Sequence, residues 1–260
     1  MLQTTPPRPQ LSVAIIARNE ARHIGEALAS VATLADEIVV LLDNRTRDTT
    51  ASIATAHGAR VLIEPWRGFP AQRNYALQVC TGEWVLFLDA DERIPPPLAN
   101  ELRALLRDQP AAAGFWIPRE NSFFGQVLRG GGWYPDPQLR LMRRSQARYD
   151  EQRLVHELVQ IDGPVSTLRN PLLHLNIEQF DELWRKQTSY AYQEAQTLWR
   201  EGRRARLRNF VGAPLREFVR RYLQLGGWRD GRIGLLMCAT LAYFEVIKFM
   251  HLWGLQQVAR

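Results

Sequence analysis

Cysteine is scarce in this chain, and the usual features of secreted and repeat proteins are missing. Only Cys80 and Cys238 occur among the 260 residues, which excludes a disulfide framework and predicts a reducing compartment. The first ten residues are polar and proline-rich, without an apolar run, so we expect no secretory signal. There is also no internal repeat and no low-complexity tract.

Apolar residues are plentiful enough for a substantial core. They make up 46% of the chain, while charged residues make up 23%, and this balance excludes wholesale disorder, a collagen helix and a coiled coil. The length predicts one large domain, or one domain with an appendage.

Positive charge is concentrated in the second half of the chain. Residues 1–134 carry 13 basic and 14 acidic side chains, whereas residues 135–260 carry 20 basic and 13 acidic ones. The segment 200–232 alone holds ten arginines and three acids. Such a block indicates an anionic partner, which could be nucleic acid, an anionic membrane or a phosphorylated ligand.

The first hundred residues alternate between short apolar runs and amphipathic helical patterns. This alternation predicts βαβ units, and therefore a parallel sheet with helices on both faces. The predicted strands are residues 11–17, 37–42, 60–63 and 84–88, and the predicted helices are residues 24–31, 48–57, 68–79 and 97–107. Ligands of such sheets bind beside the carboxyl ends of the strands.

Acidic residues stand at two of these strand ends. Asp43 closes the second strand, and Asp89, Ala90, Asp91 and Glu92 follow the fourth. Neighbouring carboxylates repel one another unless a cation or hydrogen-bond donors lie among them, and Mg²⁺ or Mn²⁺ shared with substrate phosphates suits this position. The alternative is a solvated turn at a helix entry, because acids favour helix N-termini.

Two more positions near these strand ends are candidates for binding a nucleotide. Asp43 can accept hydrogen bonds from a base or a ribose, although the adjacent Asp48 and Thr49 could simply cap a helix. Arg73, on the first turns of the third helix, is a candidate contact for a diphosphate, the alternative being an exposed surface arginine.

The pattern changes after residue 110. Residues 114–118, 138–143 and 165–175 predict shorter strands, and residues 178–200, 204–225 and 232–257 predict helices with a break at Gly226-Gly227. We interpret Gly130-Gly131-Gly132, which precedes Trp133 and Tyr134, as a flexible acceptor loop, with a simple turn as the alternative. The two aromatic side chains could stack on a sugar or pack in the core.

Several motifs in order carry a family resemblance. They occupy residues 17–20, 43–50, 68–77, 88–93, 133–141, 155–157 and 172–174. Together they resemble family 2 glycosyltransferases with the GT-A fold, and more narrowly the bacterial branch that includes the lipopolysaccharide inner-core β-glucosyltransferases. The resemblance covers about residues 10–260. It implies an α/β catalytic domain at residues 1–176, with a Rossmann-like, mostly parallel sheet, and a helical, membrane-associating region at residues 177–260.

The resemblance also implies roles for matching residues. The donor nucleotide sugar would be contacted by Ala17, Arg18, Asn19, Glu20, Asp43, Arg73, Asp89 and Ala90. Asn19, Glu20 and Asp43 would hold the base, and Arg73 would lie near the base or phosphate. Asp89 would face the ribose and the metal shell, Asp91 would ligate a divalent metal directly, and His174 would complete the metal site. A satisfied core histidine is the alternative for His174.

An inverting transfer needs a carboxylate that takes the proton of the acceptor hydroxyl, while the departing diphosphate is stabilised by metal and arginines. Glu157 is the first candidate for this base and Asp136 the second. The alternative for Glu157 is a surface residue paired with Arg153.

One segment departs from the family pattern. Similar enzymes often have small residues after the aspartate of the second strand, whereas this chain has Asn44-Arg45-Thr46-Arg47. The two arginines could contact phosphate or acceptor, or could change which nucleotide fits. UDP as the carrier is therefore less firmly indicated than the fold.

The last apolar stretch, residues 233–255, is long enough to span a bilayer. Glu245, Lys248 and His251 are spaced so that they share one helix face, and buried charges would cost roughly 2.5–3.5 kcal/mol each in a bilayer centre. We therefore expect a helix that lies in the membrane interface, with arginines on lipid headgroups. The alternatives are a soluble dimerisation or core-covering helix and a true transmembrane span.

These features predict a metal-dependent, inverting glycosyltransferase that moves a hexose from a nucleotide sugar to a lipid-linked saccharide, such as a lipopolysaccharide core. Its expected place is the cytoplasmic face of the bacterial inner membrane, bound peripherally or monotopically to an anionic surface, with self-association through the C-terminal helices as an option. Transfer to a polyprenyl phosphate is the alternative. A nucleic-acid-binding module would give no role to Asp89 and Asp91. A nucleotidyltransferase would require a glycine-rich phosphate-binding loop after the first strand, which residues 17–20 lack.

Overall fold

The computed structural model describes residues 10–151 and 159–258. The chain divides into two compact units. The sheet unit takes in Met1–Arg119 and Pro137–His174, and the helical unit takes in Glu120–Asp136 and Leu175–Arg260. The helical unit therefore includes residues 120–136, which the sequence analysis assigns to the first domain.

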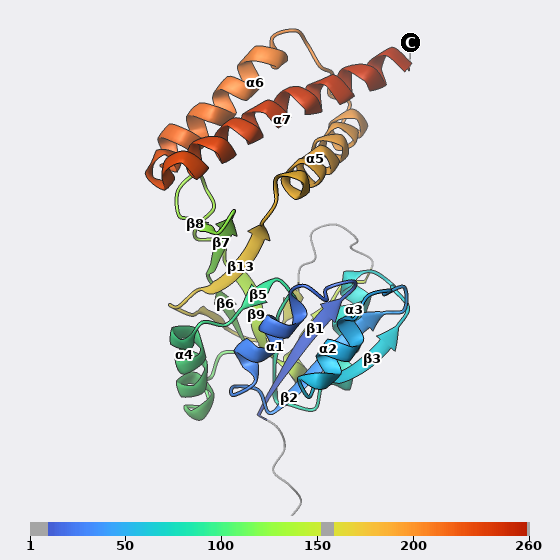
Figure 1. Cartoon of the computed structure of the whole chain (residues 1–260), viewed down its shortest axis with the longest axis vertical. Helices are drawn as coiled ribbons and strands as arrows, with labels where there is room; N and C mark the ends of the chain where they lie inside the picture. Colours follow the sequence, from blue (N-terminus) through green and yellow to red (C-terminus); the bar gives the residue numbers. More distant parts are fainter. Residues whose placement is uncertain (1–9, 152–158, 259–260) are drawn as a thin grey trace, which may run out of the picture. The chain divides into compact units, whose positions relative to one another are not determined.

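Within the described residues, the sheet unit is built on a seven-stranded sheet with the order β12-β6-β9-β4-β1-β2-β3 (Figure 1). Its strands are β1 (Leu11–Ala17), β2 (Glu37–Asp43), β3 (Arg60–Glu64), β4 (Trp84–Phe87), β6 (Gly114–Ile117), β9 (Gln138–Arg143) and β12 (Val165–Thr167). The four strands from β4 to β3 run parallel. β9 is antiparallel to both its neighbours, and β12 is parallel to β6. The predicted mostly parallel α/β sheet is confirmed.

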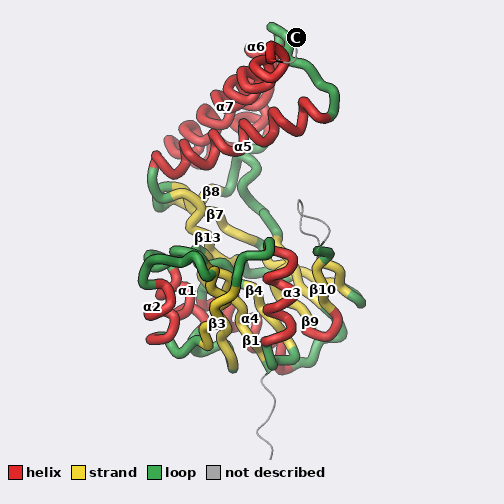
Figure 2. The backbone as a smooth tube through the Cα atoms, turned by 90° about the vertical axis from the view of Figure 1, so that its right-hand side faces the viewer, coloured by secondary structure: helices red, strands yellow, loops and turns green. Residues whose placement is uncertain are grey.

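Helices cover both faces of this sheet because successive strand residues point to opposite sides. The helices are α1 (Ile24–Val31), α2 (Thr50–Ala56), α3 (Phe69–Val79) and α4 (Pro96–Arg107). Val13 and Ile15 of β1 pack in one core with α1, α2 and α4. Ala14, between them, packs on the other face with α3 and Tyr149. In Figure 2, α3 and β10 (Ala147–Tyr149) lie side by side on that second face.

Several short strands were not predicted. β10 pairs with β11 (Val159–Ile161), and a further sheet has the order β5-β13-β7-β8. Its strands are β5 (Glu92–Arg93), β7 (Arg119–Phe123), β8 (Gln126–Leu128) and β13 (Leu172–Ile177). β7 and β13 each pass from one unit of the chain into the other. The single strand predicted at residues 165–175 is in fact β12 and β13, because the backbone N–H groups of Arg169 and Asn170 donate to the Glu101 carboxylate, both at 2.9 Å, instead of to a neighbouring strand.

Three long helical segments make up most of the helical unit (Figures 1 and 2). They are α5 (Phe180–Arg200), α6 (Asn209–Phe218), which continues as a π-helical segment (Val219–Gln224), and α7 (Gly231–Val258). The break predicted at Gly226-Gly227 is confirmed: Gly226 adopts a φ of 73°, and a short 3₁₀ turn (Gly227–Asp230) follows. α7 packs against both α5 and α6.

The glycine stretch 130–132 forms a turn that is hydrogen-bonded to Leu225 and Arg221 and is not a free loop. The N–H of Gly131 donates to Leu225 O at 2.8 Å, and Arg221 donates to Gly131 O at 2.7 Å. A Cβ on Gly130 would lie 2.2 Å from Gly226 O, so only glycine fits this close approach. Trp133, which follows, packs against Phe123 with ring centroids 4.6 Å apart. The interpretation as a flexible acceptor loop is therefore wrong, because these backbones hold each other in place.

The charged residues of α7 face its neighbours in the bundle. Lys248, whose side chain is 13% exposed, forms an ion pair with Glu194 of α5 at 3.1 Å and a second with Glu245. The ring of His251 meets the ring of Tyr192 of α5. Glu245, Lys248 and His251 lie on one side of α7, as their spacing predicts, and that side packs toward α5, whereas another side of α7 is exposed.

Candidate active site

Two adjoining cavities in the sheet unit open at the carboxyl ends of β1, β2 and β4. One has a volume of about 290 Å³ and is lined by Ile16, Glu20, Phe69, Arg73, Asp89, Ala90, Asp91 and His174. The other has a volume of about 360 Å³ and is lined by Ile16, Ala17, Arg18, Glu20, Asp43, Arg45, Trp66 and Phe69. Because Ile16, Glu20 and Phe69 line both, the cavities form one cleft. Every predicted donor-binding residue except Asn19 lines it.

The loop after β1 is shaped by Asn19. This residue adopts a φ of 55°, a left-handed conformation that asparagine tolerates better than most residues. Its side-chain oxygen accepts the N–H of Arg47 at 2.8 Å, and the N–H of Glu20 donates to the Thr50 hydroxyl at 2.8 Å. Asp48 caps the backbone of Thr50 and also accepts the N–H of Ala21. Asn19 and Asp48 therefore hold the cleft loop against α2.

Asp43 lies at the end of β2 and is almost fully buried. Arg45 holds its carboxylate through the backbone N–H at 2.9 Å and through the guanidinium at 2.6 Å, and the guanidinium of Arg18 lies 3.9 Å away. The hydrogen bonds and charge of Arg45 lower the pKa of Asp43 to about 2. Arg45, which belongs to the segment that departs from the family pattern, thus contacts the residue that is predicted to bind the base.

Aromatic rings surround the cationic residue of the cleft. The guanidinium carbon of Arg73 lies 5.9, 5.8 and 5.4 Å from the ring centroids of Phe69, Phe87 and Tyr149, which is within the range of cation–π attraction. Arg73 is half-buried and lines the same cavity as Asp89 and Asp91. Arg73 is therefore a half-buried residue of the cleft wall and not a fully exposed surface arginine.

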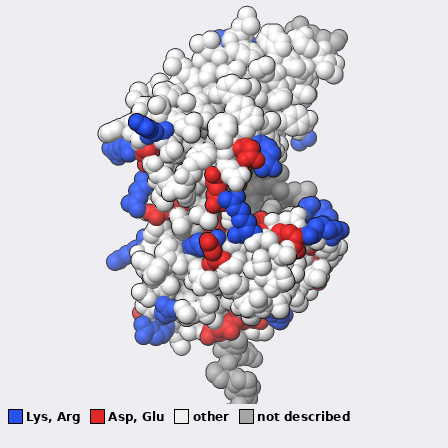
Figure 3. Space-filling model, viewed as in Figure 1, with Lys and Arg blue, Asp and Glu red and all other residues white. Residues whose placement is uncertain are grey.

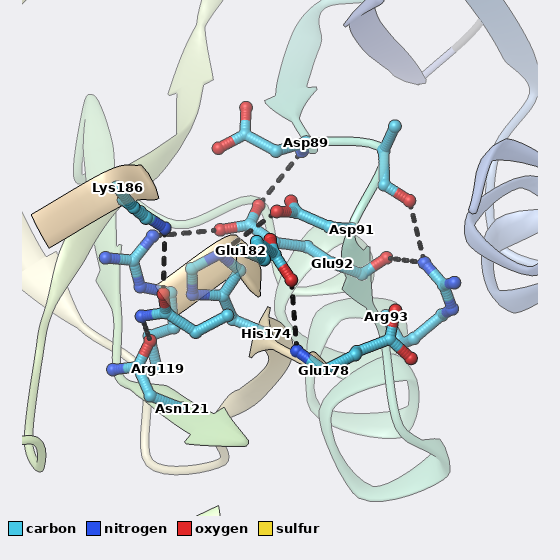
Figure 4. A network of polar contacts seen from close by, with 12 residues as sticks. Asp89, Asp91, Glu92, Arg93, Arg119, Asn121, His174, Glu178, Glu182 and Lys186 are labelled. Atoms are coloured by element: carbon cyan, nitrogen blue, oxygen red, sulfur yellow. Dashed lines mark hydrogen bonds and ion pairs between the residues drawn. The ribbon is translucent and has the colours of Figure 1, made fainter. Parts of the chain in front are cut away.

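A buried ion cluster lies behind the turn at residues 89–91. Arg140 of β9 is 4% exposed, and its guanidinium forms ion pairs with Asp89 and, at 2.7 Å, with the fully buried Glu92. Glu92 also accepts the N–H of Asp89 at 3.0 Å and lies 3.4 Å from the guanidinium of Arg119 (Figure 4). Although burial opposes it, the charge of Arg140 lowers the pKa of Asp89. Burial raises the pKa of Glu92. Arg140 therefore holds the turn that presents Asp91 to the cleft.

Asp91 and His174 meet at the wall of the same cavity. The carboxylate Oδ2 of Asp91 lies 3.2 Å from Nε2 of His174, which comes from β13 (Figure 4). Although burial raises it, the hydrogen bond from His174 gives Asp91 a pKa below its ordinary value. The described residues contain no group of three His, Cys, Asp or Glu side chains close enough to hold a metal ion. Asp91 and His174 together offer one oxygen and one nitrogen ligand, while Asp89 is engaged by Arg140.

Arg140 and Arg119 form part of this site and were not predicted, and Glu92, grouped from the sequence with the acids of a possible cation site, is instead paired with Arg140. A signal for Arg140 was present, because it stands between Leu139 and Leu141 in a predicted strand, where a charged residue that points into the core needs a partner. Nothing in the local pattern identified Asp89 and Glu92 as those partners.

The two candidate bases are distant in sequence from the cleft residues. The carboxylate of Asp136 accepts a hydrogen bond from the side-chain amide of Asn121 at 3.1 Å, within the helical unit. Glu157 and Arg153 lie outside the described residues. Their assignments stay predictions.

Comparison with known proteins agrees with this geometry. Residues 12–161 match the family model "Glycosyl transferase family 2". The chain is 31% identical to the lipopolysaccharide core biosynthesis glycosyltransferase LpsC of Rhizobium meliloti (strain 1021) over 252 residues, which cover 93% of this chain and 91% of that protein. It is 25% identical to the uncharacterized glycosyltransferase RP128 of Rickettsia prowazekii, with 94% of this chain and 87% of that protein covered.

The fold is also similar to that of a solved mannosyltransferase. The mannosyltransferase PcManGT from Pyrobaculum calidifontis, in complex with GDP-Man and Mn²⁺, matches with a TM-score of 0.52 and 14% sequence identity, over 95% of this chain and 88% of that chain. At this identity the likeness concerns the fold. The family match, the LpsC relative and the GT-A architecture agree, and the chain is a glycosyltransferase that belongs to family 2.

Proposed function

We propose that this enzyme is a metal-dependent, inverting hexosyltransferase that uses a nucleotide sugar, with UDP as the carrier, and transfers the sugar to a membrane-linked saccharide such as a lipopolysaccharide core. The observation that carries the proposal is the continuous cleft with Asp43 in one part and Arg73, Asp91 and His174 in the other. A nucleotide diphosphate needs both kinds of surroundings, one for its base and ribose and one for its charged phosphates.

The base and ribose belong in the part of the cleft around Asp43. Trp66 and Phe69 line it, with ring centroids 4.6 Å apart, and both are well exposed for large aromatic side chains. Such rings can stack on a base, and Asp43 is an acceptor for its N–H groups or for ribose hydroxyls. Arg45 already holds Asp43, so donor binding has to share this carboxylate with the guanidinium or displace Arg45 toward the phosphates.

The diphosphate belongs beside Arg73, Asp91 and His174. Carboxylate oxygen and imidazole nitrogen are ligands that suit Mn²⁺, and a carboxylate together with substrate phosphates also suits Mg²⁺. Asp91 and His174 would hold the ion, and Asp89, fixed by Arg140, would lie beside the ribose and the ion's outer shell. When bound, the ion neutralises charge that develops on the departing diphosphate. Arg73 adds a fixed positive charge on the same side.

The transfer itself is a single displacement at the anomeric carbon. The acceptor hydroxyl gives its proton to a carboxylate, its oxygen forms the new bond to the anomeric carbon, and the bond to the diphosphate oxygen breaks with its electrons on the diphosphate. Glu157 is the proposed base, on the strength of the motif at residues 155–157, and Asp136 is the second candidate.

The proposed acceptor class is that of the relative whose printed role is lipopolysaccharide core biosynthesis. A membrane-linked acceptor also explains the basic segment 200–232, which suits an anionic membrane surface on the cytoplasmic side. The same segment would serve transfer to a polyprenyl phosphate equally well. Self-association through the C-terminal helices stays a further option for this region.

Donor and metal binding are tested together by thermal shift, because a ligand that binds the folded form stabilises it by mass action. UDP-glucose and GDP-mannose are each added with and without Mn²⁺. We expect a rise in melting temperature with a UDP-sugar that depends on Mn²⁺ in the wild type and is lost in Asp91→Asn, while Asp108→Asn, an exposed carboxamide control on α4's C-terminal side, behaves as the wild type. Stabilisation by the nucleotide sugar that is indifferent to Mn²⁺ and to Asp91→Asn would remove the metal from the proposal.

The acceptor is tested by product formation. Purified enzyme is incubated with the nucleotide sugar that stabilises it in the thermal-shift assay and with lipopolysaccharide core oligosaccharide, lipid-linked core or polyprenyl phosphate as the acceptor. Sugar incorporation into core acceptors supports the proposal, whereas incorporation into polyprenyl phosphate alone supports the alternative.

A further inference from the structure

The outward face of α7 is apolar along its length. Leu236, Tyr243 and Met250 recur every seven residues, which is two helical turns, and they are 38%, 45% and 56% exposed. Ala239 and Gly254, also exposed, lie on the same face between and beyond them. No charged side chain interrupts this stripe within the described part of α7, whereas a helix face in contact with water normally carries polar and charged residues.

A second apolar stripe runs along α6. Leu207, just before the helix, and Val211 and Leu215 within it are spaced by four residues and are 77%, 71% and 60% exposed. On the face of the molecule in Figure 3, Lys, Arg, Asp and Glu side chains are sparse over the bulk of the helical unit. A soluble bundle buries such residues between its helices.

One charged residue of α7 faces α5 at the edge of an otherwise apolar interface between the helices. Lys248 of α7 is held between Glu194 of α5 and Glu245. This arrangement, with ion pairs toward the neighbouring helix and aliphatic side chains outward, is typical of helices in contact with lipid.

The exposed surface of α5 includes polar side chains that require contact with water. Polar and charged side chains, among them Arg185, Thr188, Gln193 and Thr197, alternate there with exposed aromatic ones, which are Phe180, Trp184, Tyr190 and Tyr192. Because α5 packs along α7, α7 cannot cross a bilayer unless these polar side chains enter hydrocarbon. By length and composition alone, α7 belongs to the one helical stretch of the described residues, Gly227–Val258, that is long and apolar enough to span a membrane.

Arginines gather near both ends of α7. The N–H of Ala205 donates to Gln256 at 2.6 Å, which brings the exposed Arg206 and Arg208 near the C-terminal end. Arg229 and Arg232 stand at the other end. A helix of 28 residues is about 42 Å long, so a crossing helix would place one positive cluster on each side of the membrane, against the usual excess of positive charge on one side. A helix that lies flat places both clusters at the same headgroup level.

We propose that the α6–α7 face of the helical unit lies flat in the interface of an anionic bilayer, with the stripes of Leu236, Tyr243 and Met250 and of Leu207, Val211 and Leu215 in the acyl-chain border, and α5 on the aqueous side. The arginines near the ends of α7 contact phosphate headgroups. The occupant is a lipid surface, because apolar stripes flanked by clustered positive charge complement an anionic bilayer. This membrane contact does not depend on the chemistry of the cleft, although its biological purpose rests on the proposed membrane-linked acceptor.

Binding is measured by co-sedimentation of the full chain with vesicles of phosphatidylcholine alone or mixed with phosphatidylglycerol. We expect partition onto the mixed vesicles that weakens with added salt. Met250→Glu and Tyr243→Glu should each weaken binding about tenfold, and Arg206→Gln with Arg208→Gln should weaken it about 25-fold. Gln193→Glu adds the same charge on the exposed side of α5 and should leave binding within about twofold.

Met250, Arg206 and Arg208 are exposed, so their variants should melt like the wild type in buffer. The ring of Tyr243 also contacts that of Trp184 of α5, with centroids 5.4 Å apart, so Tyr243→Glu should melt at a lower temperature. The melting temperature therefore separates loss of binding from loss of folding. Equal loss in Gln193→Glu and Met250→Glu would overturn the proposal, since the effect would then be one of overall charge. A wild type that ignores both vesicle types and instead forms a dimer that Met250→Glu dissociates would overturn it in favour of a second copy on this face.

The flat orientation has its own test. Single labels are attached to Leu236→Cys, Tyr243→Cys and Met250→Cys in the folded protein, whose native Cys80 and Cys238 are buried. Quenching by spin-labelled lipids should report the same shallow depth at all three positions. A much deeper label at residue 243 would mean that α7 crosses the bilayer and would overturn the orientation. None of these measurements uses sugar transfer, so their failure is distinct from failure of the proposed catalytic function.

Discussion

Replacement of Arg140 by methionine should destabilise the sheet unit strongly, because it removes the cation from a buried cluster. Arg140 is 4% exposed, and Glu92 is fully buried, so in Arg140→Met the Glu92 carboxylate loses its 2.7 Å partner without gaining water. Breaking one side of a buried ion pair costs roughly 3–5 kcal/mol. Arg119 remains 3.4 Å from Glu92, and the side chain of Asp89 is 44% exposed, so we expect the lower end, about 3 kcal/mol.

The assay is thermal unfolding followed by circular dichroism. A loss of about 3 kcal/mol lowers the melting temperature of a chain of this size by roughly 6–12 °C. The matched control is Arg67→Met, which removes an exposed ion pair with Glu64, side chains 55% and 20% exposed, and should cost less than about 1 kcal/mol.

A double variant separates the buried charge from lost packing. In Arg140→Met with Glu92→Gln no carboxylate is left unpaired at the buried position, and the glutamine oxygen can still accept the N–H of Asp89. We expect the double variant to recover to within about 1 kcal/mol of the wild type. If Arg140→Met costs no more than Arg67→Met, or if the double variant is no more stable than the single one, the cluster is not held by charge and the reasoning is refuted.

Three further outcomes are expected. Because Arg45 lowers the pKa of Asp43 to about 2, the stability that this carboxylate contributes is complete above about pH 4 and is lost as the pH falls toward 2. The difference in melting temperature between wild type and Asp43→Asn should therefore be constant from roughly pH 5 to 8 and become smaller below about pH 4. Arg73→Gln should raise the donor KM about tenfold or more, since one charge-assisted contact is lost, with KM from initial rates as the check. Glu157→Gln should bind the donor normally in thermal shift and yet transfer no sugar, and near-normal transfer, with loss in Asp136→Asn instead, would move the base to Asp136.

The parallel half of the fold could be predicted well. The runs at β1, β2 and β4 are apolar on both sides of the strand, apart from Ser12 and the terminal Glu37 and Asp43, because helices cover both faces of the sheet. The predicted boundaries agree with the structure within about one residue. The small strands β5, β7 and β8 could not be predicted, because two to five residues carry too little periodic pattern to indicate a strand.

The candidate site divides in the same way. Asp43, Asp89 and Asp91 could be placed at one edge of the sheet, since each follows a parallel strand and such strands end on the same side. That Asp89 is held by Arg140, 51 residues later, could not be predicted, because it depends on the insertion of β9 antiparallel to β4. The local pattern at residues 43–47 likewise gave no sign that Arg45 turns back onto Asp43.

The order and type of the main helices and strands, and the sheet edge where the acids gather, were readable from residue spacing because backbone propensity and side-chain periodicity act over a few neighbouring residues. Which side chains pair with each other could not be predicted from residue spacing. Whether a carboxylate meets an arginine, and whether α7 turns Lys248 or Met250 outward, depends on which distant segments pack alongside. Burial and electrostatic pairing act through space between residues far apart in the chain, and so the assembled structure alone reveals them.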